Sequence, residues 1–527
     1  MPDFVNDEPD DLQGESAVHK RSTLAAISTL AFALTSSPAA FAAQPGSGLT
    51  PAPFKAEPLG TGSVKVGPPN GTVVAVGGGA QGPRIWKAFI DAAGGPDALI
   101  LDVPNNGIAR RMSVAPKWAG EGLRKNGARN VHVLFTQSRE VANSDAFVAI
   151  IKKARGIWFD GGRQFHDIQA YAGTKAERAF WGVLQRGGVI GGSSAGMAVL
   201  GDFLVRGAPS FNNYIEDYPG FDQGFGFLRD TATDMHVVAR ERLPDLTSVT
   251  ARYPNVLGIS ADEGTAWVVH GDVGRIIGRG KAFVYDANGP TDKGVPYLTL
   301  YPGDTYNLFT RQVVSRAADK SPVTRQFVTS MFRKYAAPRL GGATVLVAEN
   351  GDVFVDRAFG VLPQDRYMPR TTLPQFPIGD IKKAFTSLCA QLPAKAPPVR
   401  GVLRPAYYSS SLERCVARLS MPVGMHRTTV PPGDTQILSD VDELYRFELG
   451  LEYSSTWPNT DYSKGWTVDT FDGVQRVAAY ATRDGKRAAF VRIPSLHATV
   501  IILTNDRNAD ARAMSERILD KLLRSSG

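Results

Sequence analysis

Residues 192–196 carry a serine in the pattern that a nucleophilic serine requires. Their sequence, Gly-Ser-Ser-Ala-Gly, places Ser194 at the centre of a G-x-S-x-G motif. A short apolar run precedes the motif and a helix-forming run follows it, and in this strand–turn–helix context the serine is exposed at a sharp turn. We therefore expect Ser194 to be a nucleophile, with Ser193 as the less favoured neighbour. A Gly/Ser-rich loop is the alternative interpretation.

A serine nucleophile needs a base, and the base needs an acid that orients it. Among the seven histidines, His236 stands out because charged residues surround it at the end of an apolar segment. Burying polar groups there without partners would be costly. Downstream, Asp262 and Glu263 are adjacent acids at the end of another apolar segment. Neighbours on a strand face opposite ways, so we expect only one of the two acids to face the site.

The elements that must position these residues alternate between short β-rich runs and helical runs. Strands are expected near 72–76, 98–103, 131–135, 156–159 and 188–191. This alternation predicts a mostly parallel sheet with both faces covered. In such folds the ligand site gathers at the carboxyl ends of the strands, where the glycine-rich turns and the turn at Ser194 would meet.

The first glycine-rich turn also allows a dinucleotide-binding interpretation. Gly77, Gly79 and Gly82 satisfy G-x-G-x-x-G, and Asp102 follows at about the distance of a ribose-binding acid. However, Pro83 stands where the phosphate-binding helix should open. A tight glycine turn is therefore the favoured interpretation, and no cofactor is expected.

Four motifs occur in a characteristic order: Gly-Gly-x-Gln at 161–164, Ser-Ala-Gly at 194–196, Asp-x-His-(x)3-Arg-x-Arg at 234–242 and Asp-Glu-x-Thr-Ala at 262–266. In this combination, residues from about 70 to 315 resemble the cyanophycinase branch of the serine peptidase family that also contains aspartyl dipeptidase. The resemblance implies a three-layer α/β sandwich related to class I glutamine amidotransferases. It also implies hydrolysis of cyanophycin, an arginine-bearing poly-aspartate, to β-Asp-Arg dipeptides through an acyl-enzyme, without metal or cofactor.

The resemblance assigns roles to matching positions. Ser194 is the expected nucleophile, His236 the general base and Glu263 the orienting acid. The backbone N–H groups of Gly162 and Ala195 are expected to form the oxyanion hole. The substrate-binding residues that the resemblance implies are Gln164, Asp234, Arg240 and Arg242.

Three substitutions depart from the family pattern, and a basic residue expected after Leu243 is absent. Arg163 replaces an aspartate, Met235 replaces a polar glutamine and Glu241 replaces a glycine. These changes affect the pocket and leave the triad intact. Two alternatives therefore stay open: a dipeptidase that acts on aspartyl or isoaspartyl peptides, and a binding protein without catalytic activity.

Residues 340–527 resemble a class C β-lactamase or penicillin-binding-type serine hydrolase, an α+β fold, with a reduced helical lobe. The resemblance rests on an opening hairpin at 343–360, a Pro-Val-Gly-Met segment at 422–425 and a final strand and helix. Lys383 occupies the lysine position of S-x-x-K, but Asp380 stands where the nucleophilic serine belongs. A carboxylate cannot form the acyl-enzyme of that family, so this domain is predicted to be non-catalytic.

The N-terminus predicts export to the periplasm or outside the cell. A basic flank at 19–21, an apolar stretch at 24–34 and an A-x-A site at 40–42 are typical of a signal peptide. An apolar helix of a soluble domain is the alternative, and the long acidic run before the flank leaves the true start codon open. The predicted organisation is a signal peptide at 1–42, a flexible linker at 43–66, the peptidase domain at 67–316, a linker helix at 317–339 and the second domain at 340–527.

Composition excludes several other classes. The formal charge of +8 is mild for 527 residues, and no long Lys/Arg tract is present, so nucleic-acid binding is disfavoured. Beyond the signal, no segment reaches membrane-spanning length. Two cysteines are too few for a metal cluster, and Cys389 and Cys415 form either one disulfide or two buried thiols. The sequence leaves open whether the chain forms a homodimer.

Overall fold

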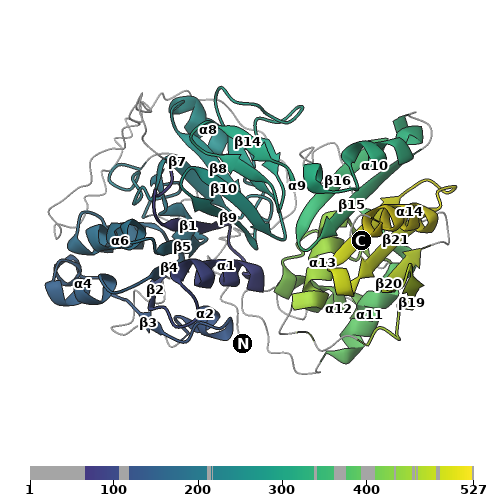
Figure 1. Cartoon of the computed structure of the whole chain (residues 1–527), viewed down its shortest axis with the longest axis horizontal. Helices are drawn as coiled ribbons and strands as arrows, with labels where there is room; N and C mark the ends of the chain where they lie inside the picture. Colours follow the sequence, from purple (N-terminus) through teal and green to yellow (C-terminus); the bar gives the residue numbers. More distant parts are fainter. Residues whose placement is uncertain are drawn as a thin grey trace, which may run out of the picture.

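The computed structural model describes residues 66–105, 118–209, 215, 218–336, 341–360, 375–392, 410–431, 435–453, 457, 461–481 and 487–524. The predicted signal peptide and residues 43–65 of the predicted linker lie outside this part of the chain. The described residues form two bodies side by side, an N-terminal α/β body and a C-terminal body built on an antiparallel sheet (Figure 1). No helix in the described ranges is long and apolar enough to cross a membrane.

The N-terminal body is centred on a nine-stranded sheet in the order β14-β13-β10-β9-β1-β5-β4-β2-β3. The half from β1 to β3 is parallel, and the half from β9 to β14 is antiparallel. The sheet is thus mixed, and the prediction of a mostly parallel sheet holds for its first half. The parallel strands are β1 (Thr72–Val76), β2 (Ile100–Asn105), β3 (Val131–Val133), β4 (Gly156–Gly162) and β5 (Val189–Ser193). The antiparallel strands are β9 (Thr265–His270), β10 (Val273–Gly278), β13 (Thr305–Asn307) and β14 (Gln312–Ser315).

A second sheet in the same body was not predicted. Its order is β12-β11-β8-β7-β6, with β6, β7 and β8 parallel and the other two strands antiparallel. The sequence indicated only that His236 follows an apolar strand end, because polar residues such as Thr231, Thr233 and Asp234 interrupt the apolar pattern of β7, although all three are buried. The strands are β6 (Gly201–Phe203), β7 (Leu228–Met235), β8 (Leu257–Ala261), β11 (Ala282–Tyr285) and β12 (Leu298–Leu300).

Alternate residues of β1 show how the large sheet is covered. Val74 and Val76 belong to a core beneath helix α1 (Pro83–Ala93). Val73 and Ala75 belong to the main core, which they share with the second sheet and with α6 (Lys175–Gln185). Both faces are therefore covered, as predicted, but one of them largely by a sheet. The remaining helices of this body are α2 (Glu121–Lys125), α3 (Arg139–Ala142), α4 (Asp145–Ile151), α5 (Phe165–Tyr171), α7 (Ala195–Ala198) and α8 (Leu246–Arg252).

The C-terminal body is built on a six-stranded antiparallel sheet in the order β16-β15-β22-β21-β20-β19. Its opening hairpin lies where the sequence predicted it. The tip, Asn350-Gly351, has positive φ at both residues, as a tight hairpin turn requires. The strands are β15 (Gly342–Glu349), β16 (Asp352–Gly360), β19 (Thr467–Phe471), β20 (Val474–Ala481), β21 (Arg487–Ile493) and β22 (Ala498–Thr504). A separate small sheet pairs β17 (Phe376–Pro377) with β18 (Leu438–Ser439).

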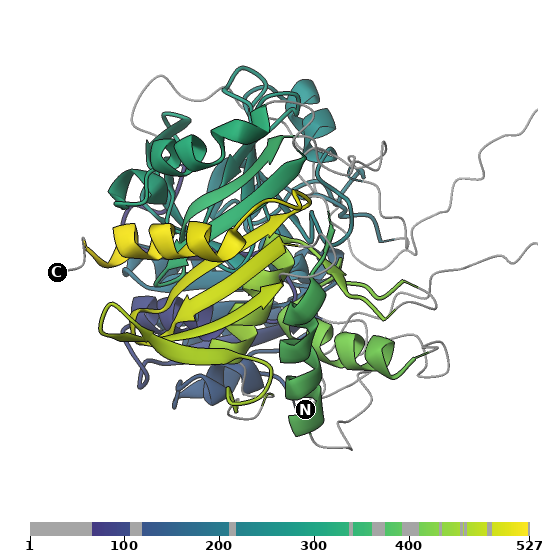
Figure 2. The ribbon, with the colours of Figure 1, turned by 90° about the vertical axis from the view of Figure 1, so that its right-hand side faces the viewer.

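Helices cover both faces of this sheet, and α14 (Ala511–Leu523) lies across one of them (Figure 2). On that face the predicted linker helix is broken into α9 (Ala317–Lys320), α10 (Arg325–Met331) and a 3-10 turn at Arg333–Ala336, because Pro322 cannot continue α9. Phe332 and Tyr335, from this broken segment, are buried in the hydrophobic core between it, α14 and the sheet. The opposite face carries α11 (Lys382–Gln391), α12 (Ser411–Ser420) and α13 (Val441–Tyr453). Of the two alternatives for the cysteines, the structure shows a Cys389–Cys415 disulfide, which joins α11 to α12.

Charged side chains link the two bodies directly. Lys281 lies within 2.7 Å of Asp356 and 2.8 Å of Asp442, and Arg275 within 2.8 Å of Asp352. A backbone hydrogen bond from Val353 to the carbonyl of Pro302 joins them as well. The second body is therefore held against the carboxyl end of β8, where residues of the predicted site follow.

Candidate active site

Ser194 occupies a strained turn between a buried strand and a helix. Strand β5 ends at Ser193, and α7 begins at Ala195. Ser194 between them has φ 56° and ψ −119°, a backbone conformation that a residue with a side chain rarely adopts. The turn is tight, because a Cβ at Gly196 would lie 2.0 Å from the carbonyl oxygen of Phe159. Residues 189–200 are buried except for Ser194, which is partly exposed. The predicted strand–turn–helix is therefore observed, and Ser194 lies in its turn with its side chain partly accessible.

Ser194, His236 and Glu263 form a continuous hydrogen-bonded chain. His236 follows the end of β7 and also has positive φ, and its backbone N–H donates to the carbonyl of Gly77. The Oγ of Ser194 lies 2.8 Å from Nε2 of His236. Nδ1 of His236 lies 2.7 Å from Oε1 of Glu263. A hydroxyl, an imidazole and a carboxylate in this order can move the serine proton to the imidazole while the acid fixes the tautomer.

The surroundings of His236 keep its imidazole neutral. Burial lowers the pKa of His236, the hydrogen bond to Glu263 opposes that effect, and the charges of Arg240 and Arg242 lower the pKa further. Burial alone would raise the pKa of Glu263, but hydrogen bonds from His236 and His426 hold that pKa well below its usual range. A neutral His236 therefore contacts Ser194 through one ring nitrogen, and an ionised Glu263 contacts the other ring nitrogen.

The glycine turn after β1 lies against this chain of residues. A Cβ at Gly78 would lie 2.1 Å from Cε1 of His236, and one at Gly79 would lie 2.7 Å from Oε2 of Glu263. Both glycines have positive φ. The turn is therefore glycine-rich because the imidazole and the carboxylate pack onto its backbone. Asp102, the candidate ribose ligand, is buried, and burial and the neighbouring Asp160 raise its pKa well above normal. These observations support the tight-turn interpretation.

The two predicted oxyanion donors come from segments on either side of Ser194. Ala195 follows it directly as the first residue of α7. Gly162 ends β4, and a Cβ at the preceding Gly161 would lie 3.3 Å from Cβ of Ser194. The end of β4 therefore passes beside the serine, which places the predicted donors in one neighbourhood. Their role in binding an oxyanion stays a prediction.

The four predicted substrate-binding residues differ in exposure. Arg240 is exposed, whereas Gln164, Asp234 and Arg242 are buried. The amide of Gln164 donates to the carbonyl of Val205. Burial, followed by the charge of Arg206, lowers the pKa of Arg242 to about 10. Of the four predicted substrate-binding residues, Arg240 is thus the one that is exposed to solvent.

Asp234 has a partner that the sequence analysis did not single out. Both of its carboxylate oxygens accept hydrogen bonds from Arg206, at 3.2 and 3.1 Å, and Arg206 also contacts Asp245. Asp234 has no exposed surface. As a substrate-binding carboxylate, Asp234 would be expected to bind a substrate cation, but this geometry does not favour that role, because a buried guanidinium already occupies the carboxylate.

The three departures from the family pattern have different settings. Met235 is buried in the main core. Arg163 donates to the carbonyl of Ala208. Glu241 is exposed and has φ 56°, so a side chain stands at a position whose backbone favours glycine. Of the three, Glu241 strains the loop that carries the two arginines.

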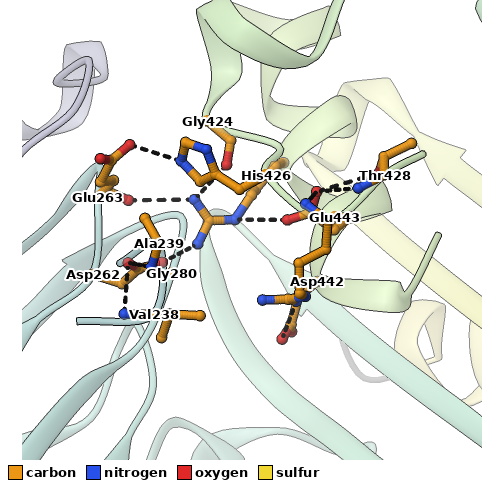
Figure 3. Close-up of polar contacts among 12 residues, drawn as sticks. Val238, Ala239, Asp262, Glu263, Gly280, Gly424, His426, Thr428, Asp442 and Glu443 are labelled. Atoms are coloured by element: carbon orange, nitrogen blue, oxygen red, sulfur yellow. Dashed lines mark hydrogen bonds and ion pairs between the residues drawn. The ribbon is translucent and has the colours of Figure 1, made fainter. Parts of the chain in front are cut away.

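Asp262 and Glu263 face opposite ways, as expected, and both meet the second body (Figure 3). Asp262 accepts hydrogen bonds from the backbone N–H groups of Val238 and Ala239, and from Arg446 at 2.5 Å. Oε2 of Glu263 lies 2.8 Å from Nε2 of His426. Sequence reasoning missed His426 and Arg446, because they lie more than 160 residues downstream in another domain and match no motif of the first.

The two residues of the second body that the sequence aligned with the S-x-x-K motif contact each other. Nζ of Lys383 lies 3.0 Å from Oδ1 of Asp380, three residues earlier in the chain. Among the described residues, no group of three or more histidines, cysteines, aspartates or glutamates is arranged to hold a metal ion.

The N-terminal body is similar in sequence to known proteins. Residues 74–277 match the sequence model of Peptidase family S51. The chain is 29% identical over 266 residues to a cyanophycinase of Synechococcus elongatus, which covers 46% of this chain and 81% of that protein. It is 26% identical over 267 residues to a cyanophycinase of a Nostoc species, which covers 46% of this chain and 88% of that protein. A peptidase structure from an acI-B1 Actinobacterium aligns with 46% of this chain and 98% of its own, at 20% identity and a TM-score of 0.36. The sequence match and the order of the site residues identify residues 74–277 as a serine-peptidase domain of family S51.

Proposed function

We propose that this chain is an exported serine exopeptidase that hydrolyses cyanophycin to β-Asp-Arg dipeptides. The hydrogen-bonded chain from Ser194 through His236 to Glu263 carries the proposal. The likeness to cyanophycinases of 26–29% identity supports the choice of substrate.

In the proposed reaction, Oγ of Ser194 attacks a backbone carbonyl of the polymer and passes its proton to Nε2 of His236. The N–H groups of Gly162 and Ala195 stabilise the oxyanion of the tetrahedral intermediate. His236 then donates the proton to the leaving amine, and an acyl-enzyme remains on the serine. Water, deprotonated by the same imidazole, releases the product, and Glu263 stays ionised throughout.

Positive charge beside the triad suits a substrate rich in carboxylates. Arg240 is exposed on the loop after His236, and Arg242 is buried two residues further. A guanidinium binds a carboxylate through two parallel hydrogen bonds, so the exposed arginine is the proposed first contact for the free α-carboxylates of the polymer's arginine branches.

One observation favours a second candidate, an aspartyl or isoaspartyl dipeptidase. The buried Arg206 occupies Asp234, the acid expected to receive a substrate cation. A substrate that lacks the arginine side chain needs no such acid, so aspartyl peptides are compatible with an Asp234 that Arg206 already occupies.

The deciding experiment incubates the purified chain with insoluble cyanophycin and, separately, with isoaspartyl dipeptides, and follows the products by mass spectrometry. Ser194→Ala serves as the matched control in each reaction. Release of β-Asp-Arg by the parent alone supports the first proposal. Cleavage of the dipeptides alone supports the second. Cleavage of neither substrate, together with failure of a fluorophosphonate to label Ser194, favours a binding protein without catalysis.

For residues 340–527 we propose a β-lactamase-like domain without hydrolase activity. The antiparallel sheet with helices on both faces supports this proposal, as does Asp380, which stands at the serine position and pairs with Lys383. Nitrocefin should stay intact. Hydrolysis that survives Ser194→Ala but is lost in Lys383→Ala would contradict the proposal.

Export is proposed on two grounds, the signal-like N-terminus and the Cys389–Cys415 disulfide, because structural disulfides persist in oxidising compartments. Cell fractionation of the expressed full-length chain tests this. Recovery in the periplasm or medium, with loss of about 42 residues, supports export.

A further inference from the structure

We propose that His426, from the second domain, is a positioning residue for Glu263, so that the second domain completes the active site of the first. This inference rests on the proposed roles of Ser194, His236 and Glu263. It gives the non-catalytic domain a function that its own degenerate site does not supply.

The first argument is the geometry of the carboxylate. Oε1 of Glu263 lies 2.7 Å from Nδ1 of His236, and Oε2 lies 2.8 Å from Nε2 of His426. The two imidazoles therefore contact opposite oxygens of one carboxylate, which fixes its rotation about the last side-chain bond. In Figure 3, Glu263 and His426 point toward each other across the boundary between the two domains.

The second argument is that the segment carrying His426 is anchored on both sides. On the N-terminal side, Gly424 has positive φ and its carbonyl accepts a hydrogen bond from Arg446, while Met425 is buried. On the C-terminal side, the backbone N–H of Arg427 donates to Glu443, and its guanidinium binds both oxygens of Asp440. A side chain on a segment held this firmly is preorganised for its contact.

The third argument is that one arginine ties this segment to the acids of the first domain. Arg446 donates to the carbonyl of Gly424 at 3.0 Å, to Asp262 at 2.5 Å and to the carbonyl of Glu263 at 3.5 Å. Arg446 and Asp262 are both nearly inaccessible to solvent, with side-chain exposures of 4% and 1%. The backbone of Glu263 and the loop of His426 are thereby held by a common side chain, so the contact between them does not depend on a surface histidine alone.

The chemical consequence concerns the base. When His236 accepts the proton of Ser194, its positive charge is stabilised by an ionised carboxylate in the correct orientation. His426 keeps its own proton in this step and donates it only as a hydrogen bond. Removing that donor frees one oxygen of Glu263 and lets the carboxylate rotate, which weakens its contact with His236.

The test uses the full chain and the rate at which a fluorophosphonate labels Ser194, because this reaction needs the triad but no knowledge of the natural substrate. His426→Ala is expected to slow labelling about tenfold, equivalent to about 1.4 kcal/mol of activation free energy. His426→Gln retains an N–H donor near the Nε2 position and is expected to restore most of the rate. His497→Ala is the matched control, since His497 is another exposed histidine of the second domain that contacts a carboxylate, Glu452, and is expected to label as the parent does.

The outcomes separate the two proposals. No labelling of the parent overturns the triad assignment and this inference with it. Normal labelling of the parent and equally fast labelling of His426→Ala overturns only the role of His426. Equal slowing by the alanine and glutamine variants, with folding of both verified by thermal denaturation, also overturns it, because the hydrogen bond is then not what matters.

Discussion

At the scale of single residues, the burial of His236 and the charges around it set the pH range of catalysis. Burial lowers the pKa of His236, Glu263 opposes that effect, and Arg240 and Arg242 lower the pKa further, so the neutral base persists below the ordinary histidine range. Serine labelling is expected to fall as the pH drops through this lowered pKa. Arg240→Gln removes one positive charge near His236 and thereby raises the pKa of its imidazole. The acidic limb of the pH profile of the labelling rate therefore shifts to higher pH. Arg240→Lys keeps the charge and should leave the limb in place. An unshifted limb in Arg240→Gln would contradict the argument.

A site residue could be predicted from the sequence when it lies in a short motif, and not when its role depends on a partner that is distant in the sequence. Ser194, His236 and Glu263 each lie in a short motif, and the structure brings all three together. Arg206 carried no local signal, and its pairing with Asp234 arises only when two distant segments meet in the core. His426 is further removed still, because its partner lies in another domain.

At the scale of elements, the glycine turn after β1 shows why a motif needs a structural context. The pattern Gly77, Gly79 and Gly82 fits a phosphate-binding loop, whereas the turn packs against the triad. Gly78→Ala places a Cβ 2.1 Å from the His236 ring at a φ of 102°, so labelling of Ser194 is expected to fall by at least about a hundredfold. Gly82→Ala is the matched control, since no atom lies within 4 Å of its Cβ. It should keep the labelling rate and cost at most about 1 kcal/mol of stability as a helix cap. A normal rate in Gly78→Ala would show that the turn tolerates displacement of the imidazole.

The strands of the large sheet were predicted where apolar residues run without interruption, as in β1, β4 and β5. The second sheet was missed because β7 buries two threonines as well as Asp234, and the partners of Thr233 and Asp234 lie on other segments. Thr233, for example, donates to the carbonyl of Met197, and Asp234 pairs with Arg206. From the sequence alone a polar residue is predicted to be exposed, because the partner that lets it be buried is visible only in the structure.

At the scale of the whole molecule, the two domains are joined by buried charges, and this determines how the chain should respond to a mutation between them. Arg446→Met removes the guanidinium and leaves Asp262 buried without its cation, so the free energy of unfolding is expected to fall by about 3–5 kcal/mol. The double variant Asp262→Asn/Arg446→Met removes the charge as well and should recover part of the loss. Urea denaturation of the parent, both single variants and the double variant measures the coupling.

The same variants connect stability with catalysis. Asp262 holds the backbone at Val238 and Ala239, just before Arg240, while Arg446 holds the carbonyl of Gly424, two residues before His426. Arg446→Met is therefore expected to slow Ser194 labelling even at urea concentrations where the chain is fully folded. If the domains only lie beside each other, stability falls while the labelling rate of the folded protein stays at the parental value. A joint loss would indicate that the second domain is retained because the first domain's acids are positioned against it.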